Sequence, residues 1–425
     1  MGITSVERTL KLSAIVFILT VFLLLEMISK IRAVNFKSFE SIDVDLSDFN
    51  VVIGQNSSGK SNLVSIFKFI KDVCSVGLSN AISLQGGLEY LLNFNNSRDG
   101  YLEIEINLDK KQNFSLGGFR GIVLSGISYK LQIYPFKRKK GIHRYVEEVA
   151  MKSTNTKVSP HVPSKIKITS ENGKIGISGE NKENINEILP FFLTGSGNSK
   201  KEMGSLIQIP PLSFFFGFGA NNVIQIYDFD PKLSKRAIPT TGKAELESDG
   251  SNTALVLRKM LNSHRDRKRF IDYIKVCLPF VSDISVDNQV DKSMLFKISE
   301  IYNSKKDIPA PIISDGTVEI ISMIYALFFE QNKFIVIEEP ERNIHPHLIS
   351  NLMHLIQEAS RYKQVIITTQ SPEIIKYVPL EKLYIIDRDK NGQSKLSRAS
   401  NSSEIKTFLR EKIGVEDLFI DGILN

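Results

Sequence analysis

The sequence is poor in cysteine and histidine, the residues that form disulfide frameworks and most zinc sites. Its 425 residues include only two cysteines and six histidines. Cys74 and Cys277 form no C-x-x-C pair, and no H-E-x-x-H spacing occurs, which excludes a disulfide scaffold and the common zinc-hydrolase motif. This cysteine usage is typical of a reducing compartment, so we expect a cytoplasmic protein.

A long hydrophobic run is also missing. The most apolar segment, LSAIVFILTVFLLL at 12–25, has 14 uncharged residues after Arg8 and Lys11, whereas a transmembrane helix needs about 20. No A-x-A-like cleavage site follows it, as a secretory signal would require. We therefore interpret residues 1–26 as an apolar leader that is not translated, with a start at Met27, and we favour this over a membrane anchor.

The charge is distributed unevenly along the chain. A composition of 42% hydrophobic and 24% charged residues is ordinary for a globular protein, and the net charge of +7 comes partly from two clusters. These are KRKKGIHR at 137–144 and HRDRKRF at 264–270. Such clusters suit phosphate backbones, although most basic runs are solvated surface, so nucleic-acid contact is an open expectation.

The sequence shows neither an internal repeat nor a sustained heptad, so we expect no long coiled-coil arm. Alternation predicts three short strands within 29–53, and segments such as YLEIEINLD and ISYKLQIYPF predict a β-rich region within 100–305. Residues 251–281 have a helical periodicity typical of two helices. The apolar runs FIVIEE at 334–339 and QVIITT at 364–369 predict parallel strands covered on both faces.

The stretch FNVVIGQNSSGKSNLVSIFKFI at 49–70 has the order strand, glycine-rich loop, helix. It fits G-x-x-x-x-G-K-[ST] without a mismatch. In such a loop the backbone amides and the helix N-terminus point at phosphates, the lysine reaches the β- and γ-phosphates, and the serine hydroxyl binds Mg²⁺. The predicted nucleotide-binding residues are Gly54, Asn56, Ser58, Gly59, Lys60 and Ser61.

Two further segments supply the rest of a nucleotide site. In KFIVIEEPERNIHP, an apolar strand ends in Glu338 and Glu339, so Glu338 would lie near the metal and Glu339 where an attacking water loses a proton. Pro346 then starts a predicted helix. In PIISDGTVEIISMIYALFF, Ser314 is a predicted N-cap, and with the amide of Gly316 it forms another anion-binding helix start.

Five segments, in this order, resemble a known family. NFKSF, GQNSSGKSNL, SDGT, IEEPERNIHP and ITTQSPEI are arranged as in the ABC-type ATPases related to structural-maintenance-of-chromosomes (SMC) and overcoming-lysogenisation-defect proteins. More closely, the chain resembles the stand-alone branch called AAA family ATPase, to which LESDGSNTALVL and the terminal FLREKIGVEDLFIDGIL are also similar. The likeness runs from about residue 27 to residue 425 and is looser in the middle.

The resemblance implies an α/β fold, a P-loop NTPase of the ABC-head type with a mixed sheet flanked by helices and a β-rich inserted region. Residues 27–135 would form the N-terminal part of the head with Walker A, 136–305 the β-rich and helical insertion, and 306–425 the C-terminal part with signature, Walker B and switch motifs. Only 55 residues follow Gln370, too few for the Toprim nuclease that some relatives append.

The resemblance also implies a homodimer that closes around ATP and Mg²⁺. The Walker A loop of one subunit would hold ATP, while Ser314, Asp315 and Gly316 of the other subunit would cover its γ-phosphate. Glu338 would take the Walker B metal role and Glu339 the role of general base.

Two residues outside these motifs are weaker candidates on the same resemblance. Lys37, in NFKSF, matches a position that often contacts nucleotide, and Gln85 is a candidate for the metal-sensing glutamine. The metal candidates are therefore Ser61, Glu338 and Gln85.

Two residues depart from the family pattern. Glu338 stands where many ABC ATPases have aspartate, so its carboxylate reaches one methylene further. Gln370, in TTQSP, stands where many relatives carry the switch histidine. Glutamine can donate a hydrogen bond to a γ-phosphate, but it has no proton that titrates near neutral pH, so ATP hydrolysis is expected to be slow.

Two functions remain open at this point. One is an ATP-hydrolysing dimer that acts on or senses DNA, with a separately encoded effector from a neighbouring gene, in defence or repair. The other, kept open by Gln370, is an ATP-gated protein-interaction switch with little hydrolysis. A transporter domain is disfavoured because Lys60 and Glu338 are 278 residues apart, and the absence of N-K-x-D favours ATP over GTP.

Overall fold

The computed structural model describes residues 27–95, 100–115, 122–136, 142–155, 159–179, 205–209, 212, 224–289 and 292–401. They form two compact units. The first is drawn from Met1–Ser47, Ser61–Ile224 and Arg388–Lys395, and the second from Asp48–Lys60, Gln225–Asp387 and Leu396–Asn425. The predicted leader, most of the basic cluster at 137–144 and the terminal segment from 408 onward lie outside the described residues.

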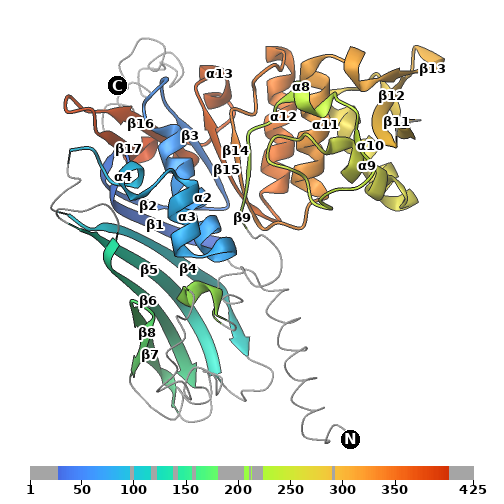
Figure 1. Ribbon diagram of the computed structural model, residues 1–425. Coiled ribbons are helices and arrows are strands. Elements are labelled where there is room, and N and C mark those ends of the chain that lie inside the picture. Colours follow the sequence, from blue (N-terminus) through green and yellow to red (C-terminus); the bar gives the residue numbers. More distant parts are fainter. Residues whose placement is uncertain are drawn as a thin grey trace, which may run out of the picture. The chain divides into compact units, whose positions relative to one another are not determined.

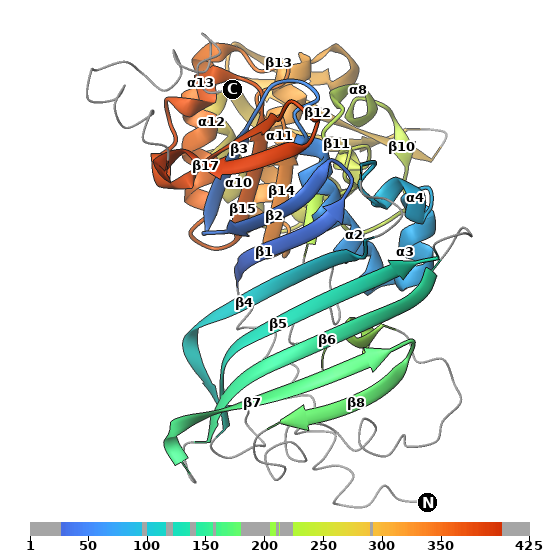
Figure 2. The ribbon, with the colours of Figure 1, turned by 90° about the vertical axis from the view of Figure 1, so that its left-hand side faces the viewer.

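The first unit is built on a seven-stranded sheet of order β2-β1-β4-β5-β6-β7-β8, paired antiparallel throughout (Figure 2). Its strands are β1 (Met27–Phe36), β2 (Phe39–Asp45), β4 (Leu102–Ser115), β5 (Ile122–Pro135), β6 (Ile142–Asn155), β7 (Ser159–Glu171) and β8 (Lys174–Gly179). The same unit contains the helices α2 (Lys60–Val76), α3 (Leu78–Leu84) and α4 (Leu88–Leu91). The rings of Phe36 in β1 and Phe69 in α2 lie 6.4 Å apart, so α2 packs on this sheet.

The two faces of this sheet differ in polarity. Buried apolar residues recur at every second position, as in Leu102, Ile104 and Ile106 of β4, which marks one covered face. On the other face Lys130 Nζ lies 3.1 Å from Glu105 Oε2, between β5 and β4. Exposed ion pairs contribute only about 0–1 kcal/mol each, so the apolar face supplies most of the stability. The prediction of a β-rich region is confirmed here.

The main sheet of the second unit has six strands in the order β17-β16-β3-β15-β14-β9. They are β3 (Phe49–Ile53), β9 (Ile224–Tyr227), β14 (Phe334–Glu338), β15 (Gln364–Thr369), β16 (Leu383–Arg388) and β17 (Ser394–Arg398). The strands β16, β3, β15 and β14 pair in parallel, and every residue of β3 and β15 is buried. The predicted parallel strands, covered on both faces, are therefore confirmed.

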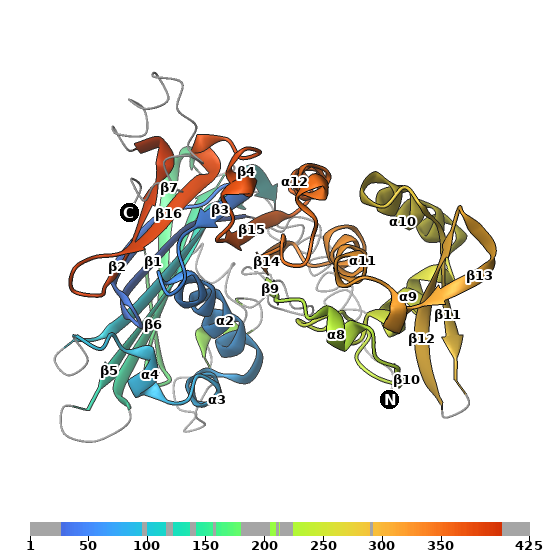
Figure 3. The same ribbon diagram turned by 90° about the horizontal axis from the view of Figure 1, so that it is seen from above.

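Helices and a smaller sheet complete the second unit (Figure 1). The helices are α8 (Pro231–Ser234), α9 (Thr253–Leu261), α10 (His264–Cys277), α11 (Asp315–Phe328), α12 (Pro346–Ala359) and α13 (Pro372–Ile375). The smaller sheet contains β10 (Ile238–Pro239), β11 (Val281–Asn288), β12 (Ser293–Glu300) and β13 (Asn303–Pro309). Figure 3 shows α10, α11 and α12 side by side, and they pack on one another. In the part of the chain that the structure describes, none of the helices combines the length and apolar character needed to cross a membrane.

Several helix predictions are confirmed. Residues 251–281 contain the two expected helices, α9 and α10. Helix α12 begins at Pro346, as the sequence indicated. Helix α11 follows Ser314, whose Oγ accepts a hydrogen bond from Thr317 N, the N-cap interaction predicted for this residue. Nearly all of α11 is buried, so it is the central helix of the second unit.

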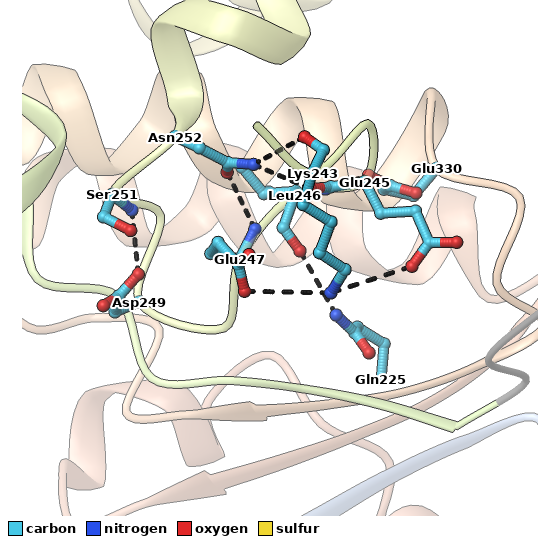
Figure 4. Close-up of polar contacts among 9 residues, drawn as sticks. All are labelled: Gln225, Lys243, Glu245, Leu246, Glu247, Asp249, Ser251, Asn252 and Glu330. Atoms are coloured by element: carbon cyan, nitrogen blue, oxygen red, sulfur yellow. Dashed lines mark hydrogen bonds and ion pairs between the residues drawn. The ribbon is translucent and has the colours of Figure 1, made fainter. Parts of the chain in front are cut away.

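A short loop, Lys243–Glu247, ties the end of α11 to the start of α9 (Figure 4). The side chain of Asn252, the N-cap residue of α9, accepts a hydrogen bond from Glu247 N at 2.8 Å and donates to two loop carbonyls at 2.8 and 3.3 Å. The fully buried Leu246 donates its N–H to Glu330 Oε1 at 2.6 Å, just after α11. The loop thus fastens the C-terminal end of α11.

The predicted domain boundaries, at 135/136 and 305/306, stay a prediction. The strands β5 and β6 lie on either side of the first boundary and pair along their length, from Ile122↔Asn155 to Pro135↔Ile142. The two compact units follow other limits.

Replacing Asn252 by alanine should destabilise the second unit. The change removes three hydrogen bonds from a side chain that is only 9% exposed. We expect a loss of about 2 kcal/mol in the free energy of unfolding, measured by chemical denaturation. The matched control Asn262→Ala, at an exposed position after α9, should change it by less than about 0.5 kcal/mol. Equal losses of unfolding free energy in the two variants would show that the hydrogen bonds of Asn252 to the loop do not stabilise the unit.

Candidate functional site

Three strand ends meet at one edge of the main sheet in the second unit. The register pairs the last residue of β3 with Thr369 of β15, and Glu338 of β14 with Thr368 of β15. Two backbone hydrogen bonds continue this pairing past the strands, from Gly54 N to Thr369 O at 3.3 Å and from Glu339 N to Thr368 O at 2.8 Å. The glycine-rich loop, the acidic pair and the residues after β15 are therefore neighbours.

The glycine-rich loop has a backbone that its glycines make possible. A Cβ on Gly54 would lie 2.4 Å from the carbonyl oxygen of Ile386, so no larger residue fits. Gly59 has a φ of 119°, a conformation that L side chains rarely adopt. Lys60 follows, only 8% exposed, and its Nζ donates hydrogen bonds to the carbonyl oxygens of Gly54 at 2.7 Å and Gln55 at 2.9 Å. The ammonium group is thus held over the loop.

The charges around Lys60 fit a nucleotide triphosphate with a divalent cation. Burial lowers the pKa of the Lys60 ammonium, and the carboxylates of Glu339, Glu341 and Glu338 act in the opposite direction. Among the described residues, no group of three or more His, Cys, Asp and Glu side chains could hold a metal alone. Mg²⁺ commonly takes one or two carboxylates together with phosphate oxygens, and the exposed hydroxyl of Ser61 and the carboxylate of Glu338 are suitable protein ligands.

Glu339 lies in an unusual backbone conformation. Its φ is 45°, in the left-handed region that costs a residue other than glycine of the order of 1 kcal/mol or more. Its side chain is 26% exposed, and Glu339 Oε2 lies 3.8 Å from Arg342 Nε. Arg342 in turn forms an ion pair with Asp228. The predicted general base is therefore oriented by its own strained backbone and faced by a guanidinium group.

Glu341 is a partly buried acid for which the sequence motifs predicted no function. Its carboxylate accepts a hydrogen bond from Thr369 Oγ1 at the end of β15. Thr369 Oγ1 accepts from Ser371 N at 2.9 Å, while Gln370 itself is exposed. Burial raises the pKa of Glu341. This acid thus ties the segment after β14 to Thr369, the residue before Gln370.

The predicted signature residues are held at the start of α11. Ser314 Oγ donates to Thr317 Oγ1 at 2.8 Å, and Asp315 forms an ion pair with Lys235 just after α8. A Cβ on Gly316 would lie 2.4 Å from the carbonyl oxygen of Asn343, so only glycine allows this approach. The signature and the segment after Walker B are therefore packed together within one subunit.

Glu319 is a buried acid that the sequence motifs did not predict as part of the site. It lies on α11, is 2% exposed, and its Oε2 accepts a hydrogen bond from Asn343 Nδ2 at 3.1 Å. Burial raises the pKa of Glu319 to about 8, an effect that the hydrogen bond and Arg342 reduce and that Glu341 and Asp228 increase. The available signal was an acid near the start of the apolar run VEIISMIYALFF.

Lys37 and Gln85 lie in the first unit. Lys37 Nζ donates to Gln85 Oε1 at 3.2 Å and to Ser65 Oγ of α2 at 3.0 Å, so these predicted residues are brought together. Burial lowers the pKa of Lys37, and Lys68 lowers it further. Their contacts with nucleotide and metal stay a prediction, as do those of Asn56, Ser58 and the other candidate site residues.

One family model matches the chain over residues 49–133 and 212–376, which is more than half of its length. It is described as AAA domain, putative AbiEii toxin, Type IV TA system. A Helicobacter pylori protein named ATP/GTP phosphatase is 21% identical over 365 residues, covering 82% of this chain and 87% of that protein. The family match includes the glycine-rich loop, the signature, the Walker B acids and Gln370.

Three solved SMC head structures are similar to the chain at low identity. An SMC head bound to the C-winged helix domain of ScpA is 14% identical with a TM-score of 0.48, covering 87% of this chain and 97% of that chain. The SMC head domain of Thermotoga maritima is 13% identical with a TM-score of 0.39, covering 87% of this chain and 98% of that chain. An SMC head of Pyrococcus furiosus, bound to the C-terminal domain of ScpA, is 12% identical with a TM-score of 0.46, covering 91% of this chain and 100% of that chain.

Glu319→Gln should change how stability depends on pH. With a folded pKa of about 8 and an ordinary value of 4.5, the folded wild type binds more protons than the unfolded chain between these values, so its stability falls as pH rises through that window. Glutamine does not titrate and its amide oxygen still accepts from Asn343. We expect the stability of the variant relative to wild type to rise by more than about 1 kcal/mol between pH 5 and pH 9.

Chemical denaturation at the two pH values measures this difference. The exposed Glu381→Gln should show a smaller change and serves as the control. A difference between wild type and Glu319→Gln that stays constant with pH would contradict the raised pKa.

Proposed function

Because the chain belongs to the family of AAA domains described as putative AbiEii toxin, Type IV TA system, it is an ATPase, and we propose that it acts as an ATP-closed homodimer on nucleic acid. The membership confirms the resemblance to ABC-type, SMC-like ATPases predicted from the sequence. The observation that supports the site is the meeting of Lys60, Glu338 and Glu339 at one edge of the parallel sheet. This arrangement combines a phosphate-binding lysine with a carboxylate that can accept a proton from an attacking water.

In the proposed site each residue has a distinct task. The loop amides of Gly54–Gly59 and the ammonium of Lys60 bind the phosphate chain, and Ser61 and Glu338 hold Mg²⁺. The metal ion, when bound, neutralises charge on the phosphates. Glu339 accepts the proton of the attacking water, and Gln370 donates a hydrogen bond to the γ-phosphate.

Dimerisation completes the site in this proposal. Ser314 and the backbone amide of Gly316 in one subunit would bind the γ-phosphate held by the other. The N-terminus of a 14-residue helix, α11, stands behind them, and its positive end favours an anion. ATP binding and subunit association would therefore be one linked equilibrium.

Nucleic acid and an effector protein are the proposed partners. The basic cluster at 264–270 lies at the start of α10, where Arg265 and Lys268 are exposed while Arg267 forms an ion pair with Asp283. Exposed cations on a helix suit a phosphate backbone, and their contribution would fall with salt. The effector is expected to be a separate protein, in defence or repair.

An ATP-gated switch with little hydrolysis is the second candidate. It is favoured by Gln370, an exposed residue directly after β15 whose amide has no proton that titrates near neutral pH. The same closed dimer would then present a surface to a partner protein and open slowly.

ATP turnover by protein starting at Met27 tests the proposal. We expect wild-type turnover to rise with double-stranded DNA and to fall at least about 100-fold in Glu339→Gln, because the general base is lost. Lys60→Ala should abolish ATP binding itself. ATP-driven dimerisation with turnover at the level of Glu339→Gln, with or without DNA, would favour the switch instead.

Gln370→His should preserve or raise the ATPase rate. Histidine can also donate a hydrogen bond to the γ-phosphate and adds a proton that titrates near neutral pH. The measurement is kcat across pH 6 to 8, with Ser371→Ala as a neighbouring control. Complete loss of turnover in Gln370→His would show that Gln370 has another function.

A further inference from the structure

The buried acid on α11 links two parts of the proposed ATP site. We propose that Glu319 is a positioning residue, which fastens the signature helix α11 to the segment Glu339–Asn343 and so holds Glu339 where it acts on water. The inference rests on the proposed function, because it concerns the same site. It adds a residue that contacts neither nucleotide nor water and acts through Asn343.

Asn343 is held against α11 at two points. Its carbonyl oxygen lies 2.4 Å from the position that a Cβ on Gly316 would occupy, and its side-chain amide donates to Glu319 Oε2 at 3.1 Å. Asn343 itself has a φ of 62°, the left-handed region that asparagine tolerates better than most residues. Since Gly316 and Glu319 are three residues apart, they lie on one face of α11. Backbone and side chain of Asn343 thus dock on that single face.

The segment between Asn343 and Glu339 is too tightly bonded to absorb a movement. Arg342 N donates to Glu339 O at 3.0 Å, and Ile344 N donates to Glu341 O at 3.1 Å. Arg342 also faces the Glu339 carboxylate at 3.8 Å. Because these two hydrogen-bonded turns span residues 339–344, a displacement of Asn343 would also displace Glu339.

A carboxyl group is a costly choice at this place on α11. Glu319 is 2% exposed, whereas the neighbouring helix positions are filled by apolar residues that pack at no such cost. The charged groups that face it are Arg342, Glu341 and Asp228. An apolar side chain would fill the space but would remove the acceptor of the Asn343 amide, and a hydrogen bond of this kind contributes about 0.5–1.5 kcal/mol. The acid therefore serves the connection to Asn343.

Helix α11 is suited to transmit a contact made at its N-terminus, at Ser314, to the segment that contains Glu339. Its first residue, Asp315, is ion-paired with Lys235, and its far end is fastened through Glu330 to the loop that Asn252 clamps. A helix held at both ends moves as a body when a phosphate from the partner subunit meets Ser314. The connection through Glu319 would make the position of Glu339 depend on that contact.

Two substitutions of Glu319 separate positioning from packing. Glu319→Leu keeps an apolar side chain of similar size but removes the acceptor, and Glu319→Gln keeps an acceptor for Asn343 Nδ2. We expect kcat for ATP to fall at least about 10-fold in Glu319→Leu, since small misplacement of a catalytic group costs this much or more. KM for ATP should stay within about 2-fold, and Glu319→Gln should keep kcat within about 3-fold of wild type.

Asn343→Gly provides an independent route, because it removes the amide and still allows the left-handed backbone. It should lower kcat like Glu319→Leu, and it serves as the test if Glu319→Leu does not fold. ATP-driven dimerisation, measured with each substitution combined with Glu339→Gln, should stay within about 2-fold of Glu339→Gln alone. Loss of dimerisation in step with kcat would overturn the positioning role.

The outcomes distinguish this inference from the function on which it rests. If wild type neither hydrolyses ATP nor dimerises with it, the proposed function fails. If wild type hydrolyses ATP and both Glu319→Leu and Asn343→Gly retain its kcat, the function stands and the positioning role of Glu319 is wrong.

Discussion

The parallel register of β3, β15 and β14 is the constraint on which the rest of the candidate site depends. Parallel strands end at one edge of a sheet, so Gly54 after β3 and Glu338 of β14, more than 280 residues apart in the chain, both lie beside the end of β15. The two backbone hydrogen bonds that continue the ladder, at Gly54 and Glu339, set the first residue of the phosphate loop and the proposed base directly against β15.

Two acids, one buried and one partly buried, connect the parts that this register brings together. Glu341 bonds to Thr369 and Glu319 bonds to Asn343, so the acidic segment after β14 is tied to β15 on one side and to α11 on the other. Burying a carboxyl group is unfavourable unless hydrogen bonds compensate, and here the raised pKa values record that cost. Such bonds specify one arrangement of the loops, which apolar contacts alone would leave less defined.

Much of the fold could be read from periodicity and from helix signals. The alternation of the first strands, the continuous apolar runs of β14 and β15, the N-cap Ser314 and the start of α12 at Pro346 were all predicted and are confirmed, because each is decided by residues close in sequence. The functions of Glu319 and Glu341 were missed because each depends on a hydrogen bond to a residue that is distant in the sequence. Their partners, Asn343 and Thr369, are 24 and 28 residues away.

Sequence alone was enough to establish the class of chemistry: a phosphate loop at Gly54–Ser61, an acidic strand end at Glu338 and Glu339, and the family to which they belong. These are short motifs whose residue types and spacing follow from what phosphates, metal ions and water require. The tertiary structure decided how the motifs are joined. The close approach of Gly316 to Asn343, the strained φ of Glu339 and the burial of Glu319 all arise from packing between distant segments, and packing is a property of the whole fold that no local pattern encodes.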